Sequence, residues 1–308
     1  MKFSFVIIAY NEEANIVACV NSVLNQRDVG NNYEIVVVDD GSHDQTASLV
    51  TEHAKSHNKV RLIGDGKNRG RGYARHAGVL ASTGKFVAMI DGDIVLPKNW
   101  LATCLKHIER NEAVSGIPVP DGDVAFIFNK FKLKPKIVIT SATITGSNGL
   151  YKREVFDKIN FNQALRNSED IEFNHQMDAA GYRGSSIGNL IVAHNESISF
   201  KQSICWLYQS GIAATYQLKK YKVFRLPDLA FFGFVAVSVL SIAAYITMNL
   251  NAYALLLIIV LYLLISSALH MHSKFELVRS PFLSLAAIFV NFSLLGAYYI
   301  GRLAGIAT

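Results

Sequence analysis

Charged residues are scarce in the last third of this 308-residue sequence, and their scarcity divides the chain into two parts. Beyond residue 228, the acidic and basic side chains are Lys274, Glu276, Arg279 and Arg302. Three apolar segments, 229–248, 252–271 and 282–303, are each long enough to cross a hydrocarbon core of about 30 Å as a helix. We therefore predict a transmembrane region at 229–308 with about three helices. A buried helical domain is the alternative interpretation.

Cysteine is also rare. The three residues, Cys19, Cys104 and Cys205, have no metal-ligand spacing. They are typical of reduced, half-buried residues in a cytosolic domain. A secretory signal peptide is not expected, because the apolar stretch 3–9 is short and runs directly into the polar residues 11–13.

Glycine-rich phosphate loops are missing as well. No Walker A lysine loop occurs, and the glycines between 64 and 72 do not follow the dinucleotide-binding spacing. Phosphate binding is then expected to depend on a metal ion and on arginines. Arg69, Arg71 and Arg75 are the available cations, with Arg71 and Arg75 one turn apart on a predicted helix. A solvated surface position is the alternative for each of them.

The first 197 residues differ from the rest, with charges throughout and alternating strand and helix patterns. Apolar runs predict strands at 3–9, 34–38, 60–63 and 85–90, and helical periodicity predicts helices at 12–25, 44–55 and 72–81. This order implies an α/β domain with a parallel sheet and right-handed crossovers. Because ligands bind at the carboxyl ends of such strands, one edge would collect Tyr10, Glu12, Asp39, Asp40, Asp91 and Asp93.

Asp91-Gly92-Asp93 follows the fourth predicted strand and is the most informative motif. Two carboxylates at a buried strand end cost desolvation and mutual repulsion unless a cation is present. Mg²⁺ or Mn²⁺ suits them, since such an ion takes one or two carboxylates and completes its shell with water and phosphates. The alternative is an ordinary turn, because Asp-Gly-Asp is common turn chemistry.

Five short motifs occur in order along this part of the chain. They are Tyr10-Asn11-Glu12-Glu13, Val38-Asp39-Asp40-Gly41-Ser42, Asn68-Arg69-Gly70 with Ala74-Arg75-His76-Ala77-Gly78, Asp91-Gly92-Asp93, and Ser168-Glu169-Asp170-Ile171-Glu172. Together they resemble the family 2 glycosyltransferases with a GT-A fold, over about residues 1–195. The resemblance implies a GT-A (nucleotide-diphospho-sugar transferase) Rossmann-like domain at 1–197, followed by an α-helical transmembrane region. It also implies sugar transfer from a nucleotide diphosphate sugar, usually with inversion.

The same resemblance assigns donor-binding residues. Tyr10, Glu12, Asp39 and Asp40 would contact the base and ribose, and Asp91 would lie near the ribose or diphosphate. The implied metal ligands are Asp91, Asp93 and His194, of which His194 follows the apolar run 190–193 and would end a strand. A structural role for this lone histidine is the alternative.

Asp170 is the candidate general base, and Glu169 beside it is expected to serve as support. A helix start is the alternative for this segment, because Ser168 can cap a helix and acids favour its first turn. Residues 147–149, Ser-Asn-Gly, would line the acceptor side or form only a turn.

Residues 198–228 are predicted to form an amphipathic interfacial helix and linker at the membrane surface. An ordinary packed helix is the alternative. The run Gln202-Ser203-Ile204-Cys205-Trp206 partly resembles the Gln-x-x-Arg-Trp motif of processive polysaccharide synthases. Cys205 stands where that motif has arginine, which favours single transfer over polymerisation. Trp206 would stack on a sugar or anchor at the interface.

Basic residues near the first apolar segment orient the chain, with Lys219, Lys220, Lys222 and Arg225 before it and an uncharged connection after it. The positive-inside rule then predicts a cytosolic catalytic domain and a C-terminus outside. These residues suit a membrane surface better than nucleic acid, so no nucleic-acid partner is expected.

The predicted function is that of an integral membrane protein of the cell membrane, an inverting and metal-dependent glycosyltransferase. Its partners would be a nucleotide diphosphate sugar donor and a lipid-linked (polyprenyl-type) or glycan acceptor at the cytosolic face. Mn²⁺ or Mg²⁺ is the expected cofactor. One alternative is a processive polysaccharide synthase, for which three spans are few unless the chain forms a homo-oligomer. A non-catalytic membrane scaffold is the other, and the clustered acids argue against it.

Overall fold

The computed structural model describes residues 2–27, 30–120, 134–135, 144–195, 200–222, 226–248, 251–276 and 295–306. The chain divides into two compact units. The first comprises residues 1–122 and 138–196, and the second comprises 123–137 and 197–308.

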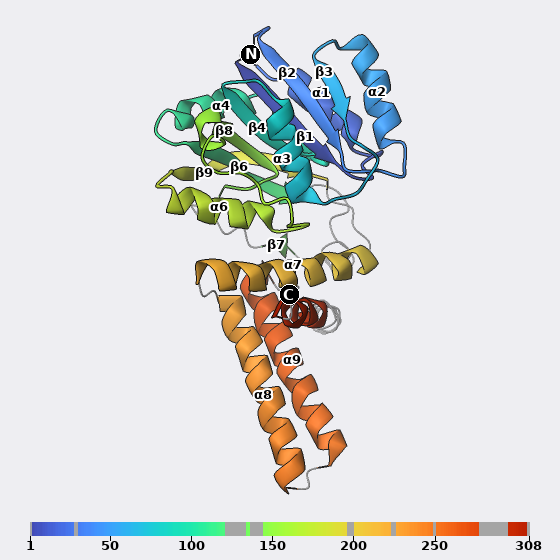
Figure 1. The fold of residues 1–308 in the computed structure, drawn as a ribbon, viewed down its shortest axis with the longest axis vertical. Coiled ribbons are helices and arrows are strands. Elements are labelled where there is room, and N and C mark those ends of the chain that lie inside the picture. The colour runs from blue at the N-terminus through green and yellow to red at the C-terminus, as the bar shows by residue number, and fades with distance from the viewer. Residues whose placement is uncertain are drawn as a thin grey trace. The chain divides into compact units, whose positions relative to one another are not determined.

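The first unit is built on one mixed sheet with strand order β3-β2-β1-β4-β8-β6-β9-β5 (Figure 1). Its parallel half consists of β1 (Phe3–Ala9), β2 (Tyr33–Asp39), β3 (Val60–Ile63) and β4 (Phe86–Asp91). The strands predicted at 3–9 and 60–63 are confirmed to the residue. Those predicted at 34–38 and 85–90 differ by one residue at their ends.

The other half of the sheet, β5 (Ile94–Val95), β6 (Ala113–Pro120), β8 (Asn148–Lys152) and β9 (Gly184–His194), includes antiparallel pairs. It was not expected from the sequence, apart from the strand end at His194. Residues 147–149 were expected to be acceptor-lining residues or a turn. In the structure Asn148 and Gly149 begin β8, beside β4.

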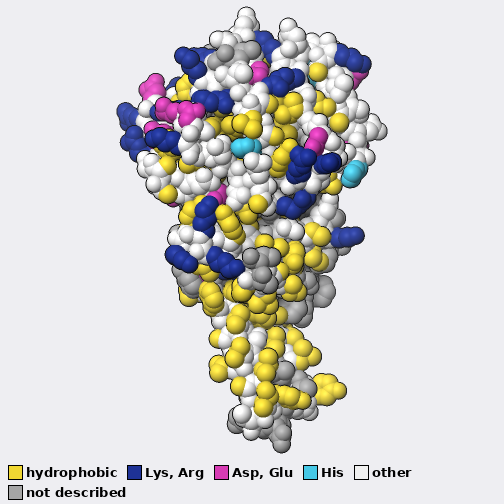
Figure 2. Space-filling model, in the orientation of Figure 1, with side chains coloured by type: hydrophobic (Ala, Val, Ile, Leu, Met, Phe, Trp, Pro, Cys, Tyr) yellow, Lys and Arg dark blue, Asp and Glu magenta, His cyan; other side chains and the backbone are white. Residues whose placement is uncertain are grey.

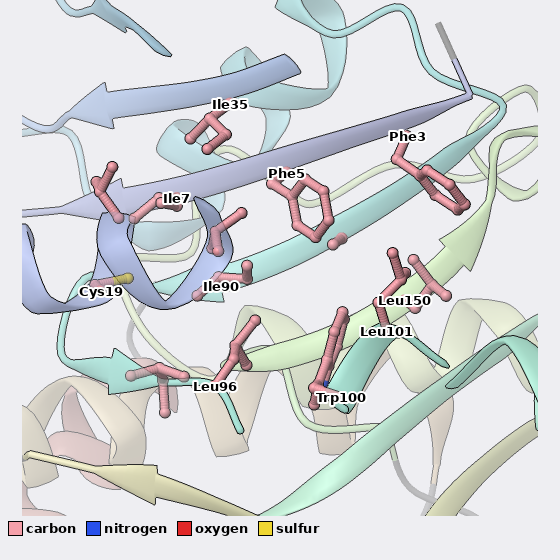
Figure 3. Packing of buried hydrophobic residues seen from close by; sticks show 14 of the residues in the cluster. Phe3, Phe5, Ile7, Cys19, Ile35, Ile90, Leu96, Trp100, Leu101 and Leu150 are labelled. Carbon is pink, nitrogen blue, oxygen red and sulfur yellow. The ribbon is translucent and has the colours of Figure 1, made fainter. Parts of the chain in front are cut away.

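Side chains of β1 alternate between two apolar layers, as the two-residue period of a strand requires. Phe3, Phe5 and Ile7 point into one layer, seen in Figure 3, and Val6 and Ile8 into the other. Burial on both faces explains why the parallel strands appear in the sequence as uninterrupted apolar runs.

Helices cover both faces of the sheet. On one face lie α1 (Ile16–Leu24), α2 (Thr46–Ser56) and α4 (Trp100–Ile108), and on the other lie α3 (Arg71–Ala81) and α6 (Glu169–Ala179). A short 3₁₀ helix, η1 (Arg153–Val155), follows β8. The helix predicted at 12–25 begins only at residue 16. The backbone N–H of Glu12 instead donates to the Thr46 hydroxyl at 2.7 Å, so residues 12–15 form a loop at the ligand edge.

The second unit contains the helices α7 (Phe200–Tyr221), α8 (Leu226–Met248) and α9 (Ala252–Lys274), and residues 295–306 are also helical. A two-residue strand β7 (Lys134–Pro135) pairs antiparallel with β10 (Phe275–Glu276). Hydrophobic side chains cover the surface along α8 and α9 (Figure 2).

One helix in the described part of the chain is long and apolar enough to span a membrane. It is residues 228–247 of α8, with a mean hydropathy of 2.3. The apolar stretch of α9, residues 256–267, is shorter. Much of the third predicted span, 282–303, lies outside the described residues, so the prediction of three spans remains untested there.

The last described helix packs on α7 through small residues. A methyl group at Gly211 or Gly301 would collide with the carbonyl oxygen of Tyr298 or Tyr208 respectively. The Thr215 hydroxyl also donates to the Arg302 carbonyl at 3.0 Å. Close backbone approach of this kind is typical of membrane helices with small residues at their interface.

Lys219 and Arg302 add polar contacts to the second unit. Lys219 Nζ donates to the carbonyls of Gly305 and Ile306 at 3.0 Å each, and the buried Arg302 guanidinium pairs with the buried Asp228 carboxylate. The end of the described chain therefore lies beside α7 and the start of α8. The position of the C-terminus relative to the membrane stays a prediction.

Candidate active site

Three parallel strands bring acidic residues to one edge of the sheet. In the strand register Ala9 lies opposite Asp39, and Ile8 lies opposite Asp91. The ends of β1, β2 and β4 therefore meet, as expected for the ligand edge of an α/β sheet.

Asp93 and His194 form the most distinctive pair at this edge. The pairing of β5 with β9 places Ile94 opposite His194, and His194 Nε2 lies 3.0 Å from Asp93 Oδ2. Asp93 is only 8% exposed, and among the described residues its Oδ1 atom has no hydrogen-bond partner. A buried carboxylate oxygen without a partner is costly unless a ligand satisfies it.

The donor set fits a divalent ion. Asp93 offers a carboxylate oxygen and His194 an imidazole nitrogen, a combination that suits Mn²⁺ and leaves room for substrate phosphates. No group of three or more His, Cys, Asp or Glu side chains suited to a metal occurs in the described ranges. Part of the coordination shell would therefore have to come from the donor and from water.

The carboxylate of Asp91, the other expected metal ligand, contacts two arginines. Its Oδ1 accepts a hydrogen bond from Arg75 Nη2 at 2.7 Å, and its Oδ2 lies 3.8 Å from Arg71 Nη1. Burial alone would raise the pKa of Asp91, but the two guanidinium groups and His194 hold it below its ordinary value. These contacts neutralise Asp91 within the protein and leave Asp93 as the better ligand.

Arg75 also departs from the expectation. It was predicted to bind the diphosphate, but its side chain is 1% exposed, and its three nitrogens donate to Asp91, Glu169 and the Gly146 carbonyl at 2.7 Å each. Three of its five N–H groups therefore donate inside the protein, and burial keeps the guanidinium away from solvent. Arg71, with 43% of its side chain exposed, remains a candidate for phosphate binding.

Glu169 and Asp170 lie in the first turn of α6, so the segment is a helix start, the alternative interpretation of this motif. Glu169 is 1% exposed, and its Oε1 accepts from Arg75, which fits the expected supporting role. Asp170 is half-buried, and its two oxygens accept from the backbone N–H groups of Ile171 at 2.8 Å and Gly146 at 3.3 Å. Ser168 occupies the N-cap position in a left-handed conformation without a side-chain capping bond. The capping alternative for this serine is therefore not supported.

The two acids at the end of β2 have different partners. Asp40 accepts the backbone N–H groups of Arg69 and Gly70 at 2.8 Å each, so it holds the loop that leads into α3. Gly70 is required there because its φ of +97° suits glycine alone. Asp39 accepts the N–H of Ser42 at 3.2–3.3 Å, and the contacts of both acids with base and ribose stay predictions.

A small pocket of about 140 Å³ opens beside these residues. Its lining includes Asp39, Asp65, Lys67 and Tyr73. Tyr10, also expected at the donor, is 42% exposed and packs edge-on to His43. Pockets for whole ligands of drug size measure about 300–1,000 Å³, so this one would take only part of a nucleotide.

Glu12 is the remaining predicted donor residue. Its carboxylate accepts from Asn15 Nδ2 at 2.9 Å. Burial, with repulsion from Asp93 and Asp91, raises the pKa of Glu12 to about 7. A strongly perturbed carboxyl beside other acids is typical of functional sites.

Sequence reasoning missed Gly146, and it predicted Asn148 to line the acceptor side or form a turn, not to hold a neighbouring backbone segment. The Gly146 peptide lies between Arg75 and Asp170, and the buried Asn148 holds the backbone of Gly116 through a 2.7 Å hydrogen bond. Only the small-residue run Gly146-Ser147-Asn148-Gly149 signalled a close backbone approach, and it is equally typical of a turn.

Comparison with solved structures identifies the fold. The chain is similar to the mannosyltransferase PcManGT from Pyrobaculum calidifontis, described in complex with GDP-Man and Mn²⁺, with a TM-score of 0.64 at 18% identity. The similarity covers 98% of this chain and 87% of that one. The domain therefore has the α/β fold of the GT-A class of nucleotide-sugar transferases.

The sequence also matches a family. Residues 4–160 match the model of glycosyl transferase family 2, and the chain belongs to that family. It is 30% identical over 125 residues to glycosyltransferase AglE of Haloferax volcanii, covering 41% of this chain and 40% of that protein. It is 40% identical over 96 residues to dolichyl-phosphate beta-glucosyltransferase ALG5C of Trichomonas vaginalis. That match covers 29% of this chain and 28% of that protein. The matches thus span less than half of these relatives.

Proposed function

We propose that this protein is a membrane-anchored glycosyltransferase that moves one sugar from a nucleotide diphosphate sugar to a lipid-linked acceptor with inversion. The observation that carries the proposal is the buried, unpartnered Oδ1 of Asp93 beside His194 at the ligand edge. Membership of glycosyl transferase family 2 supports the reaction class. The relatives named for dolichyl phosphate support a polyprenyl phosphate as the acceptor.

Donor binding would use the ends of β1, β2 and β4. Asp39 lies at the small pocket beside β2, where part of the base and ribose would fit. Asp93 and His194 would hold a Mn²⁺ or Mg²⁺ ion. When bound, such an ion stabilises negative charge on the leaving diphosphate. Arg71 would face the same oxygens from the N-terminus of α3, where a helix end also favours anions.

Asp170 would act on the acceptor. Its carboxylate takes the proton of the attacking hydroxyl as that oxygen bonds to the anomeric carbon and the bond to the diphosphate breaks. Attack opposite the leaving group inverts the anomeric configuration. The two backbone N–H groups that donate to Asp170 fix the direction of its carboxylate. With a phosphate acceptor, which is already an anion, the base is partly dispensable.

The helical unit supports the membrane assignment. Residues 228–247 of α8 form an apolar helix of spanning length, and α7 carries the exposed Trp206 and lysines near its end. Trp and Lys are typical of membrane interfaces. A cytosolic catalytic unit, with α7 at the surface, would meet a lipid-linked acceptor there.

The proposal is tested with the purified full chain in lipid, polyprenyl phosphate, Mn²⁺ and a panel of labelled nucleotide sugars. We expect one lipid product that carries one sugar by mass. A ladder of longer glycans would instead support the processive synthase. Absence of both transfer and donor hydrolysis across the panel would favour the non-catalytic scaffold. Cys205→Ser should leave the rate close to that of the wild type, because nothing in the proposed chemistry uses a thiolate.

A further inference from the structure

Arg75 connects three segments that are distant in the sequence. Its Nε donates to Glu169 at the start of α6, Nη2 to Asp91 at the end of β4, and Nη1 to the carbonyl of Gly146 just before β8. All three donor–acceptor distances are 2.7 Å. The donor side and the acceptor side of the proposed site thus share one buried cation.

The charged side chains that meet at Arg75 are buried. Arg75 is 1% exposed, and the side chains of Asp91 and Glu169 are 8% and 2% exposed. A buried ion group is stable only with good geometry and satisfied hydrogen bonds, and removal of one partner leaves the others uncompensated. The planar fork of an arginine can hold both carboxylates at fixed positions, whereas a lysine presents a single point charge.

The Gly146 peptide extends the connection to the proposed base. Its carbonyl accepts from Arg75, and its N–H donates to Asp170 Oδ2 at 3.3 Å. A Cβ atom at Gly146 would lie 2.9 Å from both Arg75 Nη2 and Asp170 Cβ. The next carbonyl along the chain, that of Ser147, accepts the N–H of Asp91 at 3.0 Å. The end of β4 and the turn that carries Asp170 therefore contact adjacent residues of one segment, Ser147 and Gly146 respectively.

We propose that Arg75 is a positioning residue that sets the base-bearing turn of α6 relative to the metal-bearing end of β4. Glu169 acts through Arg75, whose Nε donates to Glu169 Oε1 at 2.7 Å. The inference rests on the proposed function, because it takes Asp170 as the base and Asp93 as a metal ligand. It differs from a direct role in diphosphate binding, since the three guanidinium nitrogens already donate inside the protein.

A double-mutant cycle tests the coupling. We expect Asp170→Asn to lower kcat for a hydroxyl acceptor by ~10²-fold in the wild type but by less than ~10-fold in Arg75→Lys, where the base is already misplaced. The donor Kd of Arg75→Lys should stay within about threefold of wild type, whereas Arg71→Gln should weaken donor binding by about tenfold. A role in general stability alone would give additive losses in the cycle.

Gly146→Ala provides a second route if Arg75→Lys does not fold. This variant keeps every charge but forces Arg75 and Asp170 apart. We expect kcat to fall while the donor Kd stays unchanged. In this background Asp170→Asn should again lower kcat by less than it does in the wild type. Gly296→Ala is the matched control, because a Cβ there meets no atom within 4 Å.

The outcomes distinguish the positioning role of Arg75 from the proposed glycosyltransferase function. Wild type that transfers sugar but gives additive losses in both cycles would overturn the positioning role and keep the proposed function. A tenfold or larger rise in donor Kd for Arg75→Lys would assign Arg75 to the diphosphate instead. Wild type that transfers no sugar to any acceptor would overturn the proposed function, and the positioning role with it.

Discussion

His194 Nε2 lies 3.0 Å from Asp93 Oδ2, although 101 positions separate the two residues in the chain. The short strand β5 creates this proximity by pairing with the end of β9, which places Ile94 opposite His194. The neighbouring Asn195 N–H also donates to the Asp93 carbonyl at 2.8 Å. The pair is therefore fixed by backbone pairing on both sides, as a metal site requires.

His194→Ala should weaken Mn²⁺ binding in the presence of donor while the fold stays intact. Loss of an imidazole near the ion is expected to raise the Mn²⁺ Kd by at least about tenfold, in line with changes in the surroundings of metal sites. Titration calorimetry with a nucleotide sugar present measures this. His57→Ala, directly after α2, is the control and should bind Mn²⁺ as the wild type does. Equal Mn²⁺ affinity in both variants would remove His194 from the site.

Asp170→Asn should reduce turnover with a hydroxyl acceptor by ~10²-fold or more, since it removes the proposed general base. Donor affinity should change little, because Asp170 contacts the Gly146 and Ile171 backbone and lies apart from Asp39 and its pocket. Steady-state kinetics with both substrates varied separates the two effects. Asp178→Asn, an exposed position on the same helix, is the control. An unchanged rate with that hydroxyl acceptor would remove Asp170 as the general base.

Glu34 gives a prediction for stability against pH. Burial alone would raise the pKa of Glu34, but donors from Ser4, Thr83 and Arg61 hold it below its ordinary value of 4.5. A carboxyl with a lowered pKa in the folded state stabilises the protein above its unfolded pKa. That contribution disappears as the pH falls through the folded value.

Glu34→Gln should therefore cost about 2 kcal/mol at pH 7 and progressively less below pH ~4. Thermal unfolding followed by near-UV circular dichroism between pH 3 and 7 measures the difference. The exposed Glu52→Gln serves as the control and should shift the midpoint little at any pH. A pH-independent loss for Glu34→Gln would show that shape, not charge, matters at this position.

The contacts of the last helix predict an even number of membrane crossings. Lys219 on α7 contacts the carbonyls of Gly305 and Ile306, and α7 precedes the first apolar helix. Tags before Met1 and after Thr308 should therefore both be protected from an impermeant reagent added outside cells. In a Cys205→Ser background, Asn251→Cys in the connection between α8 and α9 should react. A C-terminal tag labelled from outside would restore the topology expected from charge alone.

The parallel half of the sheet follows directly from the sequence. Strands buried on both faces are continuous apolar runs, so β1 and β3 could be placed to the residue. The ligand edge followed as well, because strand ends of a parallel sheet must meet there. His194 was predicted for the same reason, as a polar residue that ends an apolar run.

The remaining features depend on pairings that local patterns do not encode. The sequence could not show that Arg75 faces Glu169, 94 positions later, and not the solvent. Asp39 and Asp40 are identical in kind, and only the loop that approaches Asp40 through Arg69 and Gly70 gives them different roles. The strand β8 was missed because Ser147-Asn148-Gly149 is turn-like in composition, whereas the neighbouring β4 holds Asn148 and Gly149 extended.

The most direct test of the central claim measures transfer of labelled sugar to polyprenyl phosphate by wild type and Asp93→Asn, each with Mn²⁺ and with excess chelator. The account predicts a singly glycosylated lipid from wild type with Mn²⁺, almost none with chelator, and little product from Asp93→Asn in either condition. Asp157→Asn, an exposed carboxylate outside the site, should behave as wild type. Full transfer by wild type in excess chelator, or by Asp93→Asn with Mn²⁺, would contradict it.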